Sequence, residues 1–321
     1  MVQRVNLVVP GDYPPHIQVS PHLARLKPYG DLTLYADRPS TVEEQLERVK
    51  DAHVILNTQV AVKWSRDELA QLPDLRMIAT CSIGTDNIDL EAARELGIVV
   101  SNQPGRVSPY VAEHVIGLLF ALAKRAAYQT AEMKAGRWAM MENVFLQGKT
   151  LGIIGAGNTG AEVARLGNAL GMKVIAWTFH PSPERAMALG VEFVELDELL
   201  RRSDAVTIQV RLSDDSRRML GARELGLMKE GALLVNAGRG DLIDTTALIE
   251  ALNSGHLGGA GLDVFDQEPL RPDHPLLACE QVAFTPHIAD QTPEGLESLN
   301  EGCVSNVIAF LDGHPQNVAN P

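Results

Sequence analysis

Short apolar runs alternate with stretches of helical periodicity over the first hundred residues. The predicted strands are Arg4–Val9, Asp31–Tyr35, His53–Leu56, Leu75–Thr80 and Ile98–Val100, and the predicted helices between them are Val42–Lys50, Ser65–Leu72 and Leu90–Leu96. Strands that alternate with helices form parallel sheets covered on both faces, because each crossover between parallel strands carries a helix. This part of the chain therefore predicts an α/β domain.

A second alternating series follows a long helical region. An apolar helix is predicted from about Tyr110 through Ala127, with another to about Lys134. Further strands are predicted at Thr150–Ile154, Lys173–Trp177, Ala205–Gln209, Ala232–Val235, Gly259–Val264 and Val282–Thr285, and an amphipathic last helix over about Thr292–Leu311. The chain shows no repeat at a solenoid period. The fold class predicted is α/β with doubly wound parallel sheets.

Length and composition fit two such domains. The chain has 321 residues, of which 45% are hydrophobic and 21% charged, an ordinary globular composition that excludes disordered, collagen-like and coiled-coil chains. Its net charge is −13, from 28 Lys and Arg against 41 Asp and Glu. We expect no general binding to nucleic acid or to anionic membranes, because phosphate binding needs surplus cations. No apolar run reaches the roughly 20 residues of a membrane span.

The cysteines and the first residues indicate a reducing compartment. Cys81, Cys279 and Cys303 are far apart and form no C-x-x-C pair, so we expect neither a disulfide framework nor a metal site. The segment Met1–Pro10 is too short and too interrupted for a signal peptide and predicts the first strand instead. The expected location is the cytoplasm.

A glycine fingerprint indicates a dinucleotide cofactor. The G-x-G-x-x-G consists of Gly155, Ala156, Gly157, Asn158, Thr159 and Gly160. It follows a predicted strand and opens an apolar helix over Ala161–Leu170, which is the context that this fingerprint requires. The glycines allow a tight turn and close approach to a pyrophosphate, and the helix start favours the anion. The alternative is an ordinary glycine-rich turn; we predict NAD(H) or NADP(H).

The adenosine end of this site leaves the choice between NAD and NADP open. Thr178 follows the next strand, where an NAD site usually carries an acid for the ribose hydroxyls. No carboxylate there repels a 2′-phosphate, and no clear Arg or Lys pair attracts one. His180 and Arg185 lie nearby, and Arg211 is either part of the pocket or a solvated surface charge. The residues predicted to line this end are Thr178, His180, Gln209, Val210 and Arg211.

Three ionisable residues follow later strands of the same predicted sheet. Arg239, Glu268 and His287 come just after them, at the edge where open α/β sheets bind ligands. A guanidinium binds a carboxylate through two hydrogen bonds, and a histidine beside a carboxylate exchanges a proton with a hydroxyl. Each residue alone is ordinarily structural or solvated. Together, after a cofactor fingerprint, they predict hydride transfer between a 2-hydroxy acid and a 2-oxo acid.

These motifs resemble the D-isomer-specific 2-hydroxyacid dehydrogenase family. The matching segments, in the family's order, are Cys81–Asp89, Val111–His114, Gly155–Gly160, Asn236–Gly240, Leu262–Phe265 with Glu268–Leu270, and Thr285–Ile288. The resemblance implies that Arg239 holds the substrate, that His287 is the acid/base and that Glu268 pairs with it. It also implies further contacts: Asp263 to the nicotinamide carboxamide, the amides of Ile83 and Gly84 to the substrate carboxylate, and Ala237, Gly238 and Ala289 in the cofactor site.

The resemblance also implies an architecture. It has two Rossmann-like or flavodoxin-like domains with the active site in a cleft between them and a hinge that closes it. The substrate-binding domain would comprise residues 1–101 and 288–321, and the dinucleotide-binding domain residues 102–287. Family members are typically homodimers through the region that corresponds here to roughly 107–145. Trp138 lies in that region, and core packing is its alternative role.

The sequence departs from the family pattern outside the proposed catalytic residues. The family commonly has an acid at the position of Thr178, and often His and Pro at those of Gln209 and Arg211. Asp290 is also unfamiliar at its position. The departures at Thr178, Gln209 and Arg211 concern the adenosine pocket, and no role is assigned to Asp290. None of them alters the predicted roles of Arg239, Glu268 and His287.

The expected substrate is glyoxylate, hydroxypyruvate or another small 2-oxo acid. Phosphoglycerate is an alternative, disfavoured because no regulatory domain follows residue 321 and Asn57–Gln59 lacks a phosphate-binding Arg, although Arg106 is a candidate for that role. Formate dehydrogenases also resemble this family, but they lack the acid at the position of Glu268. The presence of Glu268 therefore disfavours this alternative. From another class, an NAD(H)-sensing corepressor of the same fold is disfavoured by the presence of Arg239, Glu268 and His287.

Overall fold

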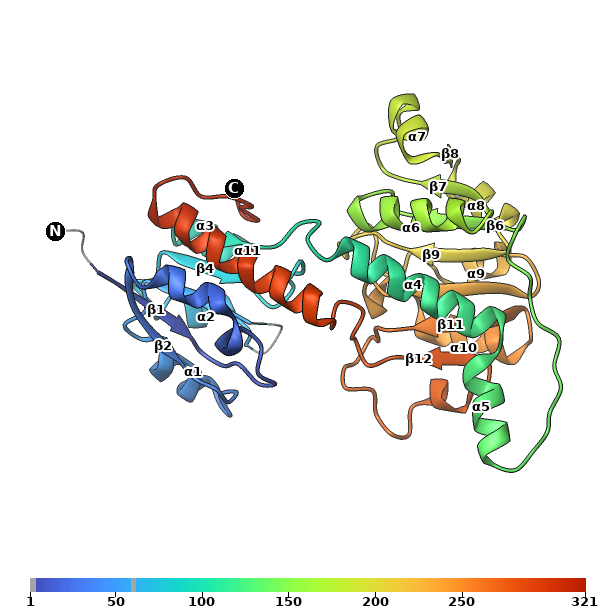
Figure 1. The fold of residues 1–321 in the computed structure, drawn as a ribbon, viewed down its shortest axis with the longest axis horizontal. Helices are drawn as coiled ribbons and strands as arrows, with labels where there is room; N and C mark the ends of the chain where they lie inside the picture. Colours follow the sequence, from blue (N-terminus) through green and yellow to red (C-terminus); the bar gives the residue numbers. More distant parts are fainter. Residues whose placement is uncertain (1–3, 59–61) are drawn as a thin grey trace. The chain divides into compact units, whose positions relative to one another are not determined.

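The computed structural model describes residues 4–58 and 62–321, which form two compact units, each around one parallel sheet (Figure 1). The five-stranded unit comprises Met1–Val107 and Gln291–Pro321, and the seven-stranded unit comprises Ser108–Asp290. The sequence predicted slightly different domain limits, residues 1–101 with 288–321 and residues 102–287. These limits stay a prediction. Met1–Gln3, and Gln59 at the end of the 57–59 loop, lie outside the described residues.

The five-stranded sheet confirms the strand pattern expected from the first hundred residues. Its strands are β1 (Val5–Val9), β2 (Gly30–Leu34), β3 (Val54–Asn57), β4 (Met77–Thr80) and β5 (Val99–Ser101), all parallel, in the order β2-β1-β3-β4-β5. Every residue of β3 and of β4 is buried, because helices cover both faces of the central strands.

Helices cover the two faces of this sheet from different parts of the chain. The helices α1 (Val42–Val49), α2 (Arg66–Leu69) and α3 (Leu90–Glu95) bury apolar residues in one cluster with β3 and β4. The long C-terminal helix α11 (Pro293–Leu311) packs on β3 and β4 together with the 3₁₀ helix Pro21–Leu26. Helix α2 ends at Leu69 and is shorter than the predicted Ser65–Leu72; Pro73 accounts only for the exclusion of Leu72 from the helix. The 3₁₀ helix Ile17–Val19 was not predicted either.

The seven-stranded sheet is also parallel throughout. It contains β6 (Thr150–Ile154), β7 (Lys173–Trp177), β8 (Glu192–Phe193), β9 (Ala205–Ile208), β10 (Ala232–Asn236), β11 (Leu257–Leu262) and β12 (Val282–Phe284), in the order β12-β11-β10-β9-β6-β7-β8. The two-residue edge strand β8 is absent from the sequence prediction because so short a run has no periodicity. The strand order reverses between β6 and β9, which is where open α/β sheets bind ligands.

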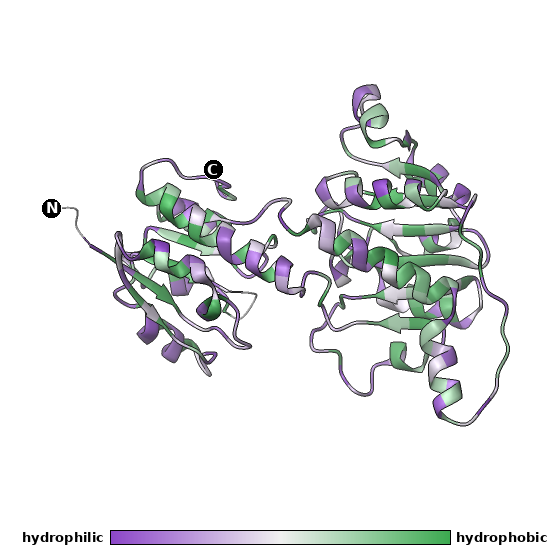
Figure 2. Ribbon diagram, viewed as in Figure 1, coloured by the Kyte–Doolittle hydropathy of each residue, from purple (hydrophilic) through white to green (hydrophobic). Residues whose placement is uncertain are grey.

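Two layers of helices enclose the seven-stranded sheet. On one face, α4 (Ser108–Ala123) and α6 (Asn158–Ala169) pack with Ile153 in one apolar cluster. On the other, α8 (Leu196–Arg202), α9 (Ala222–Leu227) and α10 (Thr245–Asn253) pack with the next residue, Ile154. Figure 2 shows the apolar character of α4 and of the strands that it covers. Helix α7 (Pro183–Leu189) follows β7.

The long helical region is broken, which corrects the predicted single helix from Tyr110 through Ala127. Helix α4 ends at Ala123 and α5 (Ala126–Lys134) begins after Arg125, whose φ of 50° is left-handed and cannot continue a helix. A segment without helix or strand, residues 135–149, then leads to β6. Of the helices that the structure describes, none combines the length and the apolar character needed to cross a membrane.

Candidate active site

The glycine fingerprint forms the turn between β6 and α6. Gly155 has a φ of 102°, and a Cβ there would lie 2.6 Å from the carbonyl oxygen of Gln209. A Cβ on Gly160 would lie 2.0 Å from the carbonyl oxygen of Gly155, so both positions require glycine. A Cβ on Gly157, in contrast, would have no described atom within 4 Å, and no described side chain caps the first amides of α6. The turn is therefore open to an anion, as a dinucleotide pyrophosphate requires.

The remaining fingerprint residues anchor α6. The hydroxyl of Thr159 lies 3.2 Å from that of Ser108 at the start of α4, and Asn158 is exposed beside it. Ala156 is buried, and its carbonyl accepts a 2.8 Å hydrogen bond from Nη2 of Arg185. These contacts hold the turn to the surrounding loops.

The predicted adenosine residues flank this turn on both sides. Thr178 directly follows β7, which pairs with β6, and the amide of Gln209 donates a 2.6 Å bond to the carbonyl of Ile154 at the end of β6. Val210 is half-buried and Arg211 is exposed. Arg185 also bonds to the carbonyl of His180, so one guanidinium joins the loop after β7 to the glycine turn. Thr178 is the residue that follows β7, so this position has no acidic side chain.

Arg239 follows β10 in a loop that buried Asn236 shapes. The side chain of Asn236 accepts a 3.0 Å bond from the amide of Gly238 and donates a 2.8 Å bond to the carbonyl of Arg239. The guanidinium of Arg239 bonds to the carbonyl of Gly238 at 2.8 Å. A Cβ on Gly240 would lie 1.9 Å from the carbonyl carbon of Phe265, so this loop touches the loop after β11. Asn236 therefore positions the Arg239 loop. The sequence analysis named Asn236 only as the first residue of the Asn236–Gly240 motif.

Glu268 and His287 meet in a direct hydrogen bond. Oε2 of Glu268 lies 2.7 Å from Nδ1 of His287, and Oε1 accepts a 2.9 Å bond from the amide of Phe265. Their strands, β11 and β12, are neighbours, with β10 and its Arg239 loop next in order. The side chains of His287 and Glu268 are 38% and 36% exposed. With Nδ1 turned toward Glu268, Nε2 is the nitrogen that can face a substrate.

The electrostatic environment keeps Glu268 charged and favours protonated His287. Burial alone raises the pKa of Glu268, but the hydrogen bonds from His287 and Phe265 and the charges of His287 and Arg239 hold that pKa below its ordinary value. The hydrogen bond to Glu268 is the largest influence on His287. It outweighs burial and the charge of Arg239, and the pKa of His287 is raised. These effects bring all three predicted groups into one electrostatic site.

Asp263 is buried next to this site, and its carboxylate forms hydrogen bonds with residues on both sides of His287. Its side chain is completely buried, and its carboxylate accepts bonds from the hydroxyl of Thr285 at 2.6 Å, the amide of Ile288 at 2.9 Å and the amide of Ala289 at 3.0 Å. Its carbonyl accepts the amide of His287 at 2.8 Å. Burial opposes ionisation, yet these contacts and His114 keep the pKa of Asp263 below its ordinary value. The contact of Asp263 with a nicotinamide carboxamide stays a prediction.

The predicted substrate amides lie in the five-stranded unit, in the loop after β4. The hydroxyl of Ser82 bonds to the carbonyl of Gly84 at 2.8 Å, and the side chain of Asn102 bonds to the carbonyl of Ile83 at 2.7 Å. These bonds use carbonyls and set the loop conformation. The role of the Ile83 and Gly84 amides in binding a substrate carboxylate stays a prediction.

Arg106 is engaged within the five-stranded unit. Its Nη1 lies 3.0 Å from a carboxylate oxygen of Glu301 and 3.1 Å from the carbonyl oxygen of Ser298. This pairing gives Arg106 a structural role and weakens the argument that it binds a substrate phosphate.

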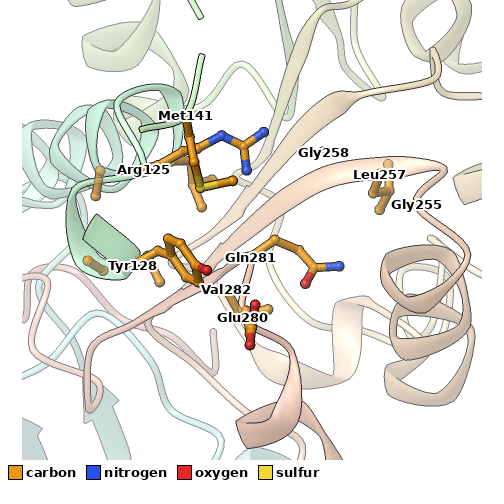
Figure 3. A pocket seen from close by; sticks show the side chains of 13 residues that line it. Arg125, Tyr128, Met141, Gly255, Leu257, Gly258, Glu280, Gln281 and Val282 are labelled. Atoms are coloured by element: carbon orange, nitrogen blue, oxygen red, sulfur yellow. The ribbon is translucent and has the colours of Figure 1, made fainter. Parts of the chain in front are cut away.

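A cavity of about 320 Å³ lies at the amino-terminal ends of β11 and β12 (Figure 3). Arg125, Tyr128 and Met141 line it together with residues around the starts of β11 and β12. Arg239, Glu268 and His287 follow the other ends of these parallel strands, so this cavity is distinct from the candidate active site. Among the residues that the structure describes, no group of three or more His, Cys, Asp or Glu side chains is placed to hold a metal.

Comparison with known proteins agrees with this geometry. Residues 116–289 match the family model of the D-isomer specific 2-hydroxyacid dehydrogenase, NAD binding domain. The chain is 38% identical over 309 residues to a glyoxylate reductase of Aeropyrum pernix, covering 93% of this chain and 92% of that protein. The chain belongs to the D-isomer specific 2-hydroxyacid dehydrogenase family. The predicted family and fold class are confirmed.

Solved structures resemble this dehydrogenase over nearly its whole length. D-lactate dehydrogenase of Aquifex aeolicus, solved with NAD and lactic acid, is 30% identical, with a TM-score of 0.83 and 96% of each chain covered. An acyclic imino acid reductase solved with NADPH and D-arginine is 27% identical, with a TM-score of 0.87 and 98% of this chain and 99% of that chain covered. The protein is thus an NAD(P)-dependent enzyme of the D-2-hydroxyacid dehydrogenase family.

Proposed function

We propose that this dehydrogenase reduces a small 2-oxo acid, glyoxylate or hydroxypyruvate, to the D-2-hydroxy acid. The observation that carries the proposal is the 2.7 Å bond between Glu268 and His287. These residues follow the carboxyl ends of β11 and β12, and Arg239 follows that of the neighbouring β10. The similarity to a glyoxylate reductase supports a small substrate. The engagement of Arg106 with Glu301 supports a substrate without phosphate.

The glycine turn fits the cofactor that this chemistry needs. The space at Gly157 and the uncapped amides of α6 would receive the pyrophosphate. Ala237, Gly238 and Ala289 border the catalytic loops and would contact the cofactor there. When bound, the nicotinamide ring supplies a hydride in the reduction and accepts one in the oxidation.

The three ionisable groups then have distinct tasks. The guanidinium of Arg239 binds the substrate carboxylate and polarises the adjacent carbonyl. Protonated His287 donates from Nε2 to the carbonyl oxygen as negative charge develops on it. Glu268 accepts the Nδ1–H bond and stabilises the imidazolium. In the oxidation, neutral His287 accepts the proton of the substrate hydroxyl at the same nitrogen.

The adenosine end supports use of both cofactors. Thr178 brings no negative charge to the end of β7, so the chain has no carboxylate there to repel a 2′-phosphate. The Arg185 guanidinium bridges the loop after β7 and the glycine turn, where it adds positive charge. We therefore propose that NADPH binds as well as NADH.

The region 107–145 supports a homodimer. After α5, Trp138 is 80% exposed, Met140 87% and Phe145 67%. A run of large apolar side chains in solvent marks a protein interface more often than a monomer surface. The exposure of Trp138 also shows that it does not pack in the core of its own chain.

A substrate panel tests the catalytic proposal. Glyoxylate, hydroxypyruvate, pyruvate and 3-phosphohydroxypyruvate are each mixed with enzyme and NADH, and in parallel with NADPH, while the nicotinamide absorbance is recorded. We expect turnover to be fastest with glyoxylate or hydroxypyruvate and to occur with both cofactors. Faster turnover of the phosphorylated acid would contradict the proposed substrate, and silence with every acid would contradict the proposed reaction.

A further inference from the structure

A histidine in the apolar helix α4, His114, lies next to the segment that carries His287. His114 lies in α4, most of whose residues are apolar, and its side chain is 21% exposed. Its Nε2 lies 2.9 Å from Oγ1 of Thr285 and 3.5 Å from Oδ1 of Asp263. Neither the cofactor site nor the proposed proton transfer uses this imidazole.

The direction of the hydrogen bonds follows from counting hydrogens. The hydroxyl of Thr285 has one hydrogen and donates it to the Asp263 carboxylate at 2.6 Å. Nε2 of His114 must therefore be the donor in the 2.9 Å contact with Thr285. The result is a chain of donors from His114 through Thr285 that ends on the buried carboxylate of Asp263.

That carboxylate holds the turn that carries the acid/base. The amides of Ile288 and Ala289 bond to the Asp263 side chain, and the amide of His287 bonds to its carbonyl. His287 itself has a φ of 54°, a conformation that residues with a Cβ seldom adopt. Such conformations persist where neighbouring bonds on both sides impose them.

We propose that His114 is a positioning residue of this dehydrogenase: by donating to Thr285 it fixes the Asp263 carboxylate, which holds the 287–289 turn so that His287 meets Glu268. The effect of His114 on turnover rests on the proposed function. His114 lies 171 positions before Thr285 in the chain, and α4 rests against β11 and β12, so the network ties the catalytic turn to a core helix.

The network has a consequence for pH dependence. The charged groups that act on His287 are Glu268, Arg239 and Asp263, and the bond to Glu268 is the largest influence raising the pKa of His287. If the turn relaxes and this bond lengthens, the pKa of His287 falls toward its ordinary value. Reduction requires the protonated imidazole, so its loss at alkaline pH would begin at a lower pH.

Three variants test the network by kinetics. His114→Leu removes the donor at similar volume, Thr285→Val removes the hydroxyl at similar shape, and His114→Gln keeps an N–H donor. We expect the first two to lower kcat about tenfold through misplacement of His287 and to move the alkaline limb to lower pH, and His114→Gln to recover part of both. The His114→Leu/Thr285→Val double variant should be no worse than the poorer single variant, because both break one chain. The exposed neighbour on α4 provides the control Glu113→Gln, expected to behave as wild type.

A measurement without turnover separates this inference from the proposed function. The imidazole of His287 is titrated by NMR in isotope-labelled enzyme, with its signal assigned through His287→Gln. A downward shift of its titration in His114→Leu and Thr285→Val supports the network even if no 2-oxo acid is reduced. An unchanged titration in folded variants, with only a lower melting temperature, would overturn it.

Discussion

At the scale of single residues, the site depends on how each ionisable group is held. Glu268 has one oxygen on the Phe265 amide and the other on His287, so its carboxylate is oriented before any substrate binds. Such pre-organisation lowers the cost of forming the imidazolium during proton transfer. Substitutions at His287 and at Glu268 separate the proton donor from the group that tunes it.

His287→Gln removes the proton donor and keeps a side chain of similar reach. We expect kcat for 2-oxo acid reduction to fall by roughly 10²–10⁴-fold, the usual contribution of general acid catalysis. NADH binding, measured by fluorescence titration, should stay unchanged because the glycine turn is not altered. A variant that turns over as fast as wild type would contradict the assignment of His287.

Glu268→Gln removes the charge that raises the pKa of His287 and retains the side-chain length. The raised pKa keeps the imidazole protonated at higher pH, so reduction by the wild type persists until the pH passes that value. In the variant the pKa of His287 falls, and kcat/KM for reduction should decline at lower pH. For oxidation, which needs neutral His287, the acidic limb should move to lower pH as well. Two unshifted limbs in the variant would contradict the role of Glu268.

At the scale of elements, two loops that follow neighbouring strands are in backbone contact. Gly240, after β10, approaches Phe265, after β11, so closely that a Cβ would lie 1.9 Å from the Phe265 carbonyl carbon. Since Phe265 also donates to Glu268, this contact connects the Arg239 loop with the acid/base pair. Backbone cannot give way as a flexible side chain does.

Gly240→Ala should therefore damage both stability and activity. We expect a loss of about 1–3 kcal/mol in the free energy of unfolding, typical of overpacking, together with lower kcat/KM. The matched control is Gly226→Ala in α9, where no described atom lies within 4 Å of an added Cβ and where alanine favours the helix. Chemical denaturation compares the two variants, and equal stabilities would contradict the steric argument.

At the scale of the whole molecule, the exposed segment after α5 predicts self-association. Trp138→Ser with Met140→Ser removes two large apolar side chains that solvent reaches in the single chain. We expect wild type to elute as a dimer and the double variant to shift toward monomer in size-exclusion chromatography with light scattering, because the interface loses apolar area. Monomeric wild type would contradict the proposed interface.

Much of the fold followed from local pattern. The alternation of apolar runs with helical periods predicted both parallel sheets, because alternation reflects burial of each strand by helices. Where it failed, the cause was local geometry without periodic signal: the break at Arg125, the early end of α2 and the two-residue strand β8. The glycine fingerprint was informative for a different reason: close backbone contacts demand glycine, at Gly160 against Gly155 within the turn and at Gly155 against Gln209 after β9.

The sequence by itself determined the α/β class, the order of the strands along the chain and the three polar segments that follow β10, β11 and β12, because these depend on residues close together in the chain. Only the tertiary structure decided that Glu268 bonds to His287, that Asn236 shapes the Arg239 loop and that His114 reaches Thr285. The pairing of side chains from different elements depends on how strands align and on which helix packs against them. Periodicity records which residues are buried, and it does not record which of them touch.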